Sequence, residues 1–170
     1  MKVIVPATHV SAETLAAIRR SGHIACVAKV GGSDTAYWEL LNTLWNLGED
    51  FTLVEQDIVV GPDTLTGFEQ CPNNWCCAPY PYLGSDKYAG NGCTRIRAQL
   101  IRECPQAMSF VGQFDYAGHG PKHWCTLDAA MQTVLQQRYL QRRCLLHEPV
   151  GHLHDEPSHG CVPGYPNSRV

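Results

Sequence analysis

The chain has 170 residues and a formal net charge of −3, with 44% hydrophobic and 17% charged residues. This length suits one domain with a substantial core, and the acidic balance gives no support to a generally basic nucleic-acid binder. No apolar run is long enough to cross a bilayer, and residues 1–10 lack the apolar stretch and cleavage site of a signal peptide. These features predict a cytoplasmic globular protein without a membrane partner.

Nine cysteines are many for a cytosolic protein. Because the number is odd and no secretion signal is visible, a full disulfide framework is not expected. No C-x-x-C pair occurs, and the spacing of Cys71, Cys76 and Cys77 is poor for a zinc finger. We therefore expect most of these thiols to be small buried hydrophobic residues.

The N-terminal part of the chain alternates between expected strands and helices. Ser11 is a suitable N-cap for the first helix, and Gly48 ends the second. Residues 23–30 are almost continuously apolar, which is typical of a strand covered on both faces. Strands are expected at residues 2–6, 23–30 and 51–60, with helices at about 11–21 and 35–47. This alternation predicts an α/β fold with a mostly parallel sheet flanked by helices.

The C-terminal half is less regular. A short helix is expected between Pro62 and Cys71, an aromatic edge strand or wall loop at 75–84, and a strand followed by a helix at 90–104. A longer helix is expected at about 127–145, with Thr126 as its cap. The end of the chain is rich in turn formers, so we expect a compact domain at 1–155 and an extended tail at 156–170.

The segment Glu55-Gln56-Asp57 follows the most hydrophobic of the expected strands. Ligands of parallel α/β sheets bind beyond the carboxyl ends of the strands, and a spacing of two places both acids on one face while the strand persists. A carboxylate leaving a buried strand requires a positive partner, which Mg²⁺ or Mn²⁺ on a diphosphate would supply. The alternative is a pair of solvated acids at a strand end.

Three further motifs carry possible chemistry. His152 and His154 form an H-x-H pair that points both imidazoles to one side of an extended segment, as metal binding requires. Asp128 begins an expected helix, where it is either a general base or a residue stabilised by the helix dipole. Asp34 ends a Gly-Gly-Ser-Asp turn that can accept hydrogen bonds from a nucleotide or be a plain connection. Solvated histidines and a simple turn are the alternatives to these functions.

In order along the chain, "VIVP", "GGSD", "FTLVEQDIVV", "GNGCTR", "TLD" and "GHLH" resemble a small GT-A-type glycosyltransferase. The likeness covers roughly residues 2–155. Within this family, the chain looks similar to compact, family 2-like glycosyltransferases of phages and bacteria. It implies a GT-A-like, Rossmann-like domain that uses a nucleotide-sugar donor, UDP-sugar above all, in a bacterial or phage-infected cell.

The resemblance also implies roles for individual residues. Asp57 matches the last acid of the D-x-D motif, which binds Mn²⁺ or Mg²⁺, while Glu55 replaces the usual first Asp. His154 or His152 matches the late histidine of the metal shell. Asp128 matches the catalytic base of inverting members, although Leu127 stands where the family has Glu. Residues of the nucleotide pocket are implied at Pro6, Ala7, Asp34, Glu55, Gln56 and Asp57.

The leading hypothesis is therefore a metal-dependent glycosyltransferase. Its acceptor stays open between a modified DNA base, a protein, a glycan and a small molecule. A nucleotidyltransferase of similar fold is a second reading, but the segment after the first strand has no Lys or Arg for a triphosphate. A third interpretation is a zinc-stabilised binding module that uses His147, His152, His154, His159 and Cys161.

Overall fold

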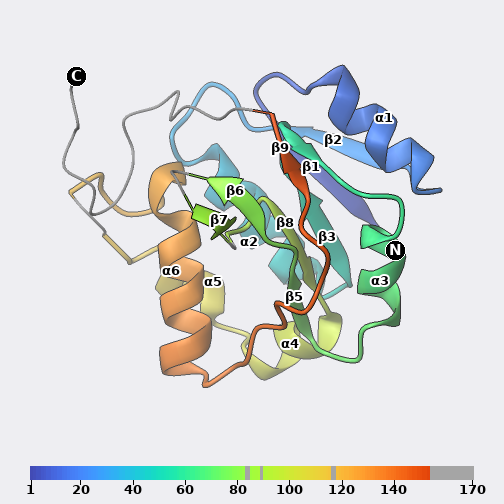
Figure 1. Cartoon of the computed structure of the whole chain (residues 1–170). Coiled ribbons are helices and arrows are strands. Elements are labelled where there is room, and N and C mark those ends of the chain that lie inside the picture. The colour runs from blue at the N-terminus through green and yellow to red at the C-terminus, as the bar shows by residue number, and fades with distance from the viewer. Residues whose placement is uncertain (83–84, 89, 116–117, 154–170) are drawn as a thin grey trace.

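A computed structural model describes residues 1–82, 85–88, 90–115 and 118–153 of the protein. A five-stranded sheet has the order β2-β1-β3-β8-β5 (Figure 1). Its strands are β1 (Val3–Ala7), β2 (Ala25–Lys29), β3 (Phe51–Val54), β5 (Trp75–Cys77) and β8 (Cys93–Ile96). Two smaller sheets pair β4 (Ile58–Val59) with β9 (Gly151–His152), and β6 (Tyr80–Tyr82) with β7 (Ser85–Tyr88). Among the described residues, no helix has the length and apolar character needed to cross a membrane.

The central sheet is mixed. β1 pairs in parallel with both β2 and β3, whereas β8 runs antiparallel to its neighbours β3 and β5. The carboxyl ends of β1 and β3 and the amino end of β8 therefore lie at the same edge of the sheet. This arrangement confirms the expected α/β fold with a mostly parallel sheet, apart from the one reversed strand.

Helices cover both faces of this sheet, and each face has its own hydrophobic core. The helices are α1 (Ala12–Arg20), α2 (Ala36–Leu47), α3 (Thr64–Gln70), α4 (Ala98–Glu103), α5 (Ala107–Val111) and α6 (Leu127–Thr133). Alternation along β1 turns Ile4 towards α2, α4, α5 and α6, and turns Val3 and Val5 towards α1 and α3. Figure 1 shows α5 and α6 on one side of the molecule and α1 and α3 on the other.

The two helices expected in the N-terminal part are confirmed. The Ser11 side chain caps α1 by accepting from the Glu13 N–H at 3.1 Å. Gly48 follows α2 with a φ of 69°, a left-handed conformation that glycine adopts without strain. Both helix ends were thus predictable from local chemistry.

The expectation that residues 23–30 are covered on both faces is wrong. β2 is an edge strand, and its Cys26, Val27 and Lys29 side chains are exposed. The apolar run indicated a strand correctly, but the position of that strand in the sheet depends on pairing with β1. Val27 is 44% exposed as a result.

The long helix expected at 127–145 is also shorter in the structure. A 3₁₀ turn, η1 (Trp124–Thr126), leads into α6, and a π-helical turn, η2 (Val134–Arg138), ends it. Leu140 then takes a positive φ of 55°, which breaks the helix. The residues beyond 138 form an extended segment, and the backbone of Cys144 in that segment forms hydrogen bonds with β5.

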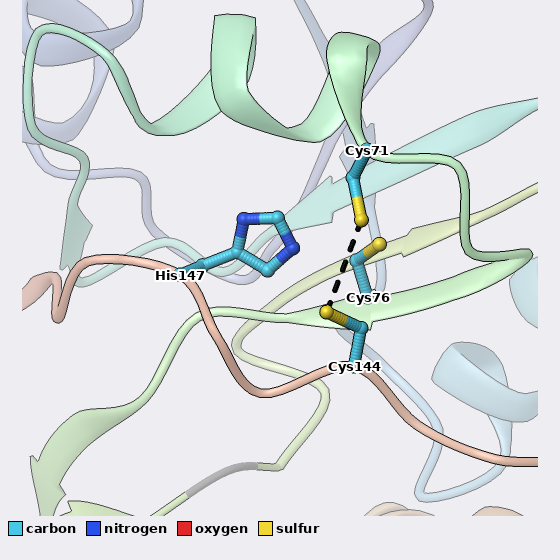
Figure 2. Close-up of side chains that lie close together, drawn as sticks. All are labelled: Cys71, Cys76, Cys144 and His147. Carbon is cyan, nitrogen blue, oxygen red and sulfur yellow. Dashed lines mark hydrogen bonds between the residues drawn. The ribbon is translucent and has the colours of Figure 1, made fainter.

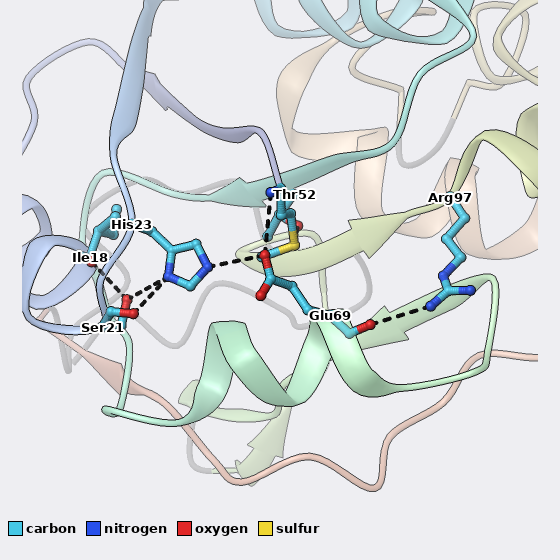
Figure 3. Close-up of polar contacts among 7 residues, drawn as sticks. Ile18, Ser21, His23, Thr52, Glu69 and Arg97 are labelled. Atoms are coloured by element: carbon cyan, nitrogen blue, oxygen red, sulfur yellow. Dashed lines mark hydrogen bonds and ion pairs between the residues drawn. The ribbon is translucent and has the colours of Figure 1, made fainter.

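Polar contacts fix the C-terminal end of α3 to other parts of the fold (Figure 3). The Glu69 carboxylate lies 3.3 Å from the N-terminal amine and 3.4 Å from His23 Nε2. Arg97, directly after β8, donates to the Glu69 carbonyl oxygen at 3.4 Å and to that of Cys71 at 2.7 Å. Cys71 therefore has a fixed position at the end of α3.

Candidate functional site

The acidic segment Glu55-Gln56-Asp57 lies at the sheet edge where β1 and β3 end, but it is a turn. β3 stops at Val54, and the next strand, β4, belongs to a different sheet. The expectation of one strand over residues 51–60 is therefore wrong, because the chain leaves the central sheet at Glu55. The two acids extend from a turn and do not alternate along a strand.

Gln56 holds this turn against the end of β1. Its side-chain oxygen accepts from the Thr8 and His9 backbone N–H groups at 2.8 and 3.1 Å, and from the Thr8 hydroxyl at 3.1 Å. Its backbone carbonyl accepts from Ser11 N–H and from the Thr14 hydroxyl. The Gln56 side chain thus orders the loop that follows β1.

Glu55 lies in a protein environment that disfavours its charge. The pKa of Glu55 is raised from 4.5 to about 8, chiefly by burial; the charges of Asp128 and Asp57 contribute to the rise, and the hydrogen bond from Tyr37 opposes it. The Tyr37 hydroxyl donates to Glu55 Oε1 at 2.7 Å. Burial, followed by the nearby carboxylates, holds the pKa of Tyr37 well above its usual value.

Asp128 reaches the same group of acids from the first turn of α6. Its Oδ1 accepts from the Asn91 N–H at 2.9 Å, just before β8. Glu55 N–H donates to the Gly92 carbonyl at 2.8 Å. The start of β8 therefore connects the Asp128 carboxylate to the turn that carries Glu55.

His152 joins the site through strand pairing. β9 pairs with β4 so that Ile58 lies opposite His152, and Leu153 N–H donates to the Asp57 carbonyl at 2.9 Å. His152 Nε2 then lies 3.5 Å from Asp57 Oδ2, with the imidazole tilted over the Tyr80 ring at 5.5 Å. His154, the other expected metal ligand, lies outside the described residues.

The remaining expected pocket residues lie at the same edge with different exposure. Pro6 and Ala7 are buried in β1, and the next residues, Thr8 and His9, are exposed. Asp34 is exposed at 75%, and its Oδ2 lies 3.7 Å from His123 Nε2. The sequence did not indicate a role for His123 or for Tyr37 at this site.

A second cluster of possible metal ligands lies outside this acidic site. Its members are Cys71, Cys76, Cys144 and His147. Each offers one sulfur or ring nitrogen atom that could bind a metal ion, and these four atoms all lie within 4.8 Å of one another. The expectation that most of the cysteines are small buried hydrophobic residues missed this grouping. The signal available in the sequence was a C-x₄-C pair together with a distant C-x-x-H pair.

The unusual pKa of Glu55 predicts a pH-dependent stability. Without added Mn²⁺, the unfolded state releases the Glu55 proton near pH 4.5, but the folded state keeps it to about pH 8. Stability contributed by this group therefore falls as pH rises through that window, by at most about 1.4 kcal/mol per pH unit. Glu55→Gln, which stays neutral, should gain stability relative to wild type as pH rises, measured by urea unfolding across this range.

The matched control is Glu49→Gln, which changes an exposed acid in the loop after α2. Its pH profile should parallel that of wild type. If Glu55→Gln also parallels wild type, the raised pKa of Glu55 is contradicted.

Comparison with known structures shows proteins of the same fold, and these include the following two. One is a glycosyltransferase involved in the glycosylation of the major capsid of PBCV-1, with a TM-score of 0.56 and 10% identity, covering 91% of this chain and 94% of that one. The other is A197 from STIV, with a TM-score of 0.53 and 11% identity, covering 91% and 87%. Models of known protein families and curated protein sequences give no match. The likeness therefore shows that this chain has an α/β fold of the kind found in a viral glycosyltransferase.

Proposed function

We propose that this chain is a metal-dependent glycosyltransferase that uses a nucleotide-sugar donor. The observation that carries the proposal is the meeting of Asp57 and His152, from distant parts of the chain, with Asp128 beside the same turn. All three belong to the sheet edge where ligands of α/β folds bind. The shared fold with a viral glycosyltransferase supports the same chemistry.

The carboxylate of Asp57 and the imidazole of His152 are suitable ligands for Mn²⁺ or Mg²⁺. Asp57 Oδ2 and His152 Nε2 are 3.5 Å apart, and neighbouring ligands of an octahedral ion of this size are about 3.0 Å apart, so a small shift brings both into one shell. Such an ion, when bound, acts as a Lewis acid for the departing diphosphate. It would also offset the repulsion among the three carboxylates, and the expected outcome is a lower pKa for Glu55.

The other residues have separate roles in this proposal. Asp128 is the general base for the acceptor hydroxyl, oriented by its hydrogen bond from Asn91, and the reaction then inverts the anomeric configuration. Gln56 positions the loop of Thr8 and His9, exposed residues that would line the nucleotide. Asp34, which lies beside His123, accepts a hydrogen bond from a ribose hydroxyl or a base N–H in this proposal.

The acceptor is open between a protein, a glycan, a modified DNA base and a small molecule. Arginines recur at 95–102 and 138–143, but Arg95 is buried at 2% exposure and Arg138 stacks over Phe110. This placement weakens the case for DNA.

A thermal-shift screen tests the proposal. UDP and the other nucleoside diphosphates are added to the protein with and without Mn²⁺, since a ligand of the native state raises the melting temperature by mass action. At least one nucleotide should raise it more with Mn²⁺ than without, and free phosphate serves as a control for nonspecific anion binding. Absence of any metal-dependent shift across the nucleotides would contradict the proposal.

A further inference from the structure

Four side chains of types that can bind a metal ion come from three separate segments and meet beside the edge of the central sheet (Figure 2). One follows the last residue of α3, one lies in β5, and two lie in the extended segment between η2 and β9. We call this group the Cys₃His cluster; its members are Cys71, Cys76, Cys144 and His147.

The distances suit one tetrahedral ion. Cys71 Sγ and Cys144 Sγ are 3.8 Å apart, and both thiols are free. Zinc–sulfur bonds of about 2.3 Å in tetrahedral geometry place two sulfurs about 3.8 Å apart, whereas a disulfide requires about 2.0 Å. All four ligand atoms lie within 4.8 Å of one another, so modest movement places them around a single centre.

The imidazole of the cluster is aimed at this centre. One ring nitrogen of His147 points towards the sulfur atoms in Figure 2, and an edge-on contact with Phe68, with centroids 4.7 Å apart, holds the ring. His147 Nε2 is buried and makes no hydrogen bond within the described residues. A buried nitrogen without a partner is costly in a folded protein, and a metal bond would satisfy it.

A buried cation lies next to the thiols. Arg95 is 2% exposed, and its guanidinium donates to Cys76 Sγ at 3.3 Å and to the carbonyl oxygens of Cys71 and Asn73. No carboxylate forms a salt bridge with it in the part of the chain that the structure describes. A buried guanidinium requires a counter-charge, and zinc-bound thiolates, which carry a net negative charge as a set of three, would provide one.

We propose that the Cys₃His cluster binds one structural zinc ion. Three thiolates and an imidazole are a known structural set for zinc, and four protein ligands leave no open position for chemistry. Soft sulfur ligands select zinc over Mn²⁺ or Mg²⁺, so this ion differs from the one proposed at Asp57.

The ion fastens the segment that leads to β9. Cys144 exchanges backbone hydrogen bonds with β5, donating to the Trp75 carbonyl at 2.8 Å and accepting from Cys77 N–H at 2.9 Å. Val150 N–H donates to the Pro79 carbonyl at 2.8 Å, and His152 follows two residues later. Zinc bound at this point fixes the position of His152 beside Asp57. The zinc site itself does not depend on the proposed transfer reaction. The importance of zinc for the position of His152 does rest on that proposed function.

Metal analysis of the untagged full chain, expressed without added zinc, provides the first test. One zinc ion per chain is expected after gel filtration in metal-free buffer. X-ray absorption at the zinc edge should show three sulfur ligands and one nitrogen. Cobalt substitution should give thiolate-to-metal charge-transfer bands and the strong visible absorption of a tetrahedral site.

Neighbouring cysteines of β5 provide matched variants. Cys76→Ala should lose the zinc, whereas Cys77→Ala should keep it, because Cys77 faces the other core and contacts Thr94. Asn73 is exposed and its side chain donates to Cys71 Sγ at 3.3 Å. Asn73→Ala should fold normally and hold zinc about 10- to 100-fold more weakly in a chelator competition.

Three results would overturn the zinc site. The first is a purified wild-type chain without zinc, in which the cluster thiols react fully with alkylating reagents. The second is a Cys71–Cys144 disulfide in peptide maps of protein kept under reducing conditions. The third is zinc that is lost in Asp57→Asn but kept in Cys76→Ala, which would assign the ion to the acidic site. Zinc retained in Asp57→Asn supports the cluster whatever the outcome of the nucleotide screen.

Discussion

Asp128→Asn is expected to lower the rate of sugar transfer by about 10²- to 10⁴-fold, the usual contribution of a general base. The amide oxygen of Asn can still accept the hydrogen bond from Asn91 N–H, so the start of α6 should keep its position. Only the ability to take a proton from the acceptor hydroxyl is lost. The measurement is the single-turnover rate with the donor identified by the screen, alongside the dissociation constant of the Mn²⁺–nucleotide complex.

Binding should change little in this variant, because the base acts on the acceptor and not on the diphosphate. Asp63→Asn, which removes an exposed acid before α3, provides a control for the loss of one negative charge. The configuration at the anomeric carbon, followed by NMR, should invert in the wild-type reaction. A full transfer rate in Asp128→Asn, or a retained configuration, would remove Asp128 from the role of base.

Asp57→Asn should abolish the effect of Mn²⁺ on nucleotide binding and lower transfer by at least about 10²-fold. A Lewis acid at a departing phosphate contributes several kcal/mol, and each 1.36 kcal/mol corresponds to about a tenfold change in rate. The backbone carbonyl of residue 57 still accepts from Leu153 N–H, so β4 and β9 should remain paired. Isothermal titration with Mn²⁺ and nucleotide measures the loss directly.

His152→Ala distinguishes the contributions of His152 and Asp57 to binding of the proposed ion. It should weaken Mn²⁺ binding less than Asp57→Asn does, since a neutral imidazole supplies a weaker bond than a carboxylate to a hard cation. Unchanged Mn²⁺–nucleotide binding in Asp57→Asn would show that the ion is held elsewhere, and the proposed metal site would then be wrong.

Much of the fold was predictable from local patterns. The Ser11 cap, the Gly48 stop and the apolar repeat of α2 each act over one or two helical turns, and the structure has the helices they indicate. Errors arose where an element depends on its neighbours. The apolar run at 23–30 does form a strand, but an edge strand, and the helix beginning at Leu127 ends early at Arg138.

The candidate site divides in the same way. The alternation of strands and helices predicted that Glu55, Gln56 and Asp57 lie at the carboxyl edge of a parallel sheet, because hydrophobic periodicity indicates each element locally. The sequence could not show that Tyr37 would donate to Glu55, or that Gln56 would order the loop after β1. These contacts depend on the spatial fit of side chains from different elements.

The sequence by itself determined the alternation of strands and helices and the residue types available for chemistry. Only the tertiary structure decided which of them meet, because long-range contacts arise from strand pairing and packing and have no signature in local spacing. It placed His152 at Asp57 through the pairing of β9 with β4, and it brought Cys144 and His147 to Cys71 and Cys76 through backbone bonds with β5.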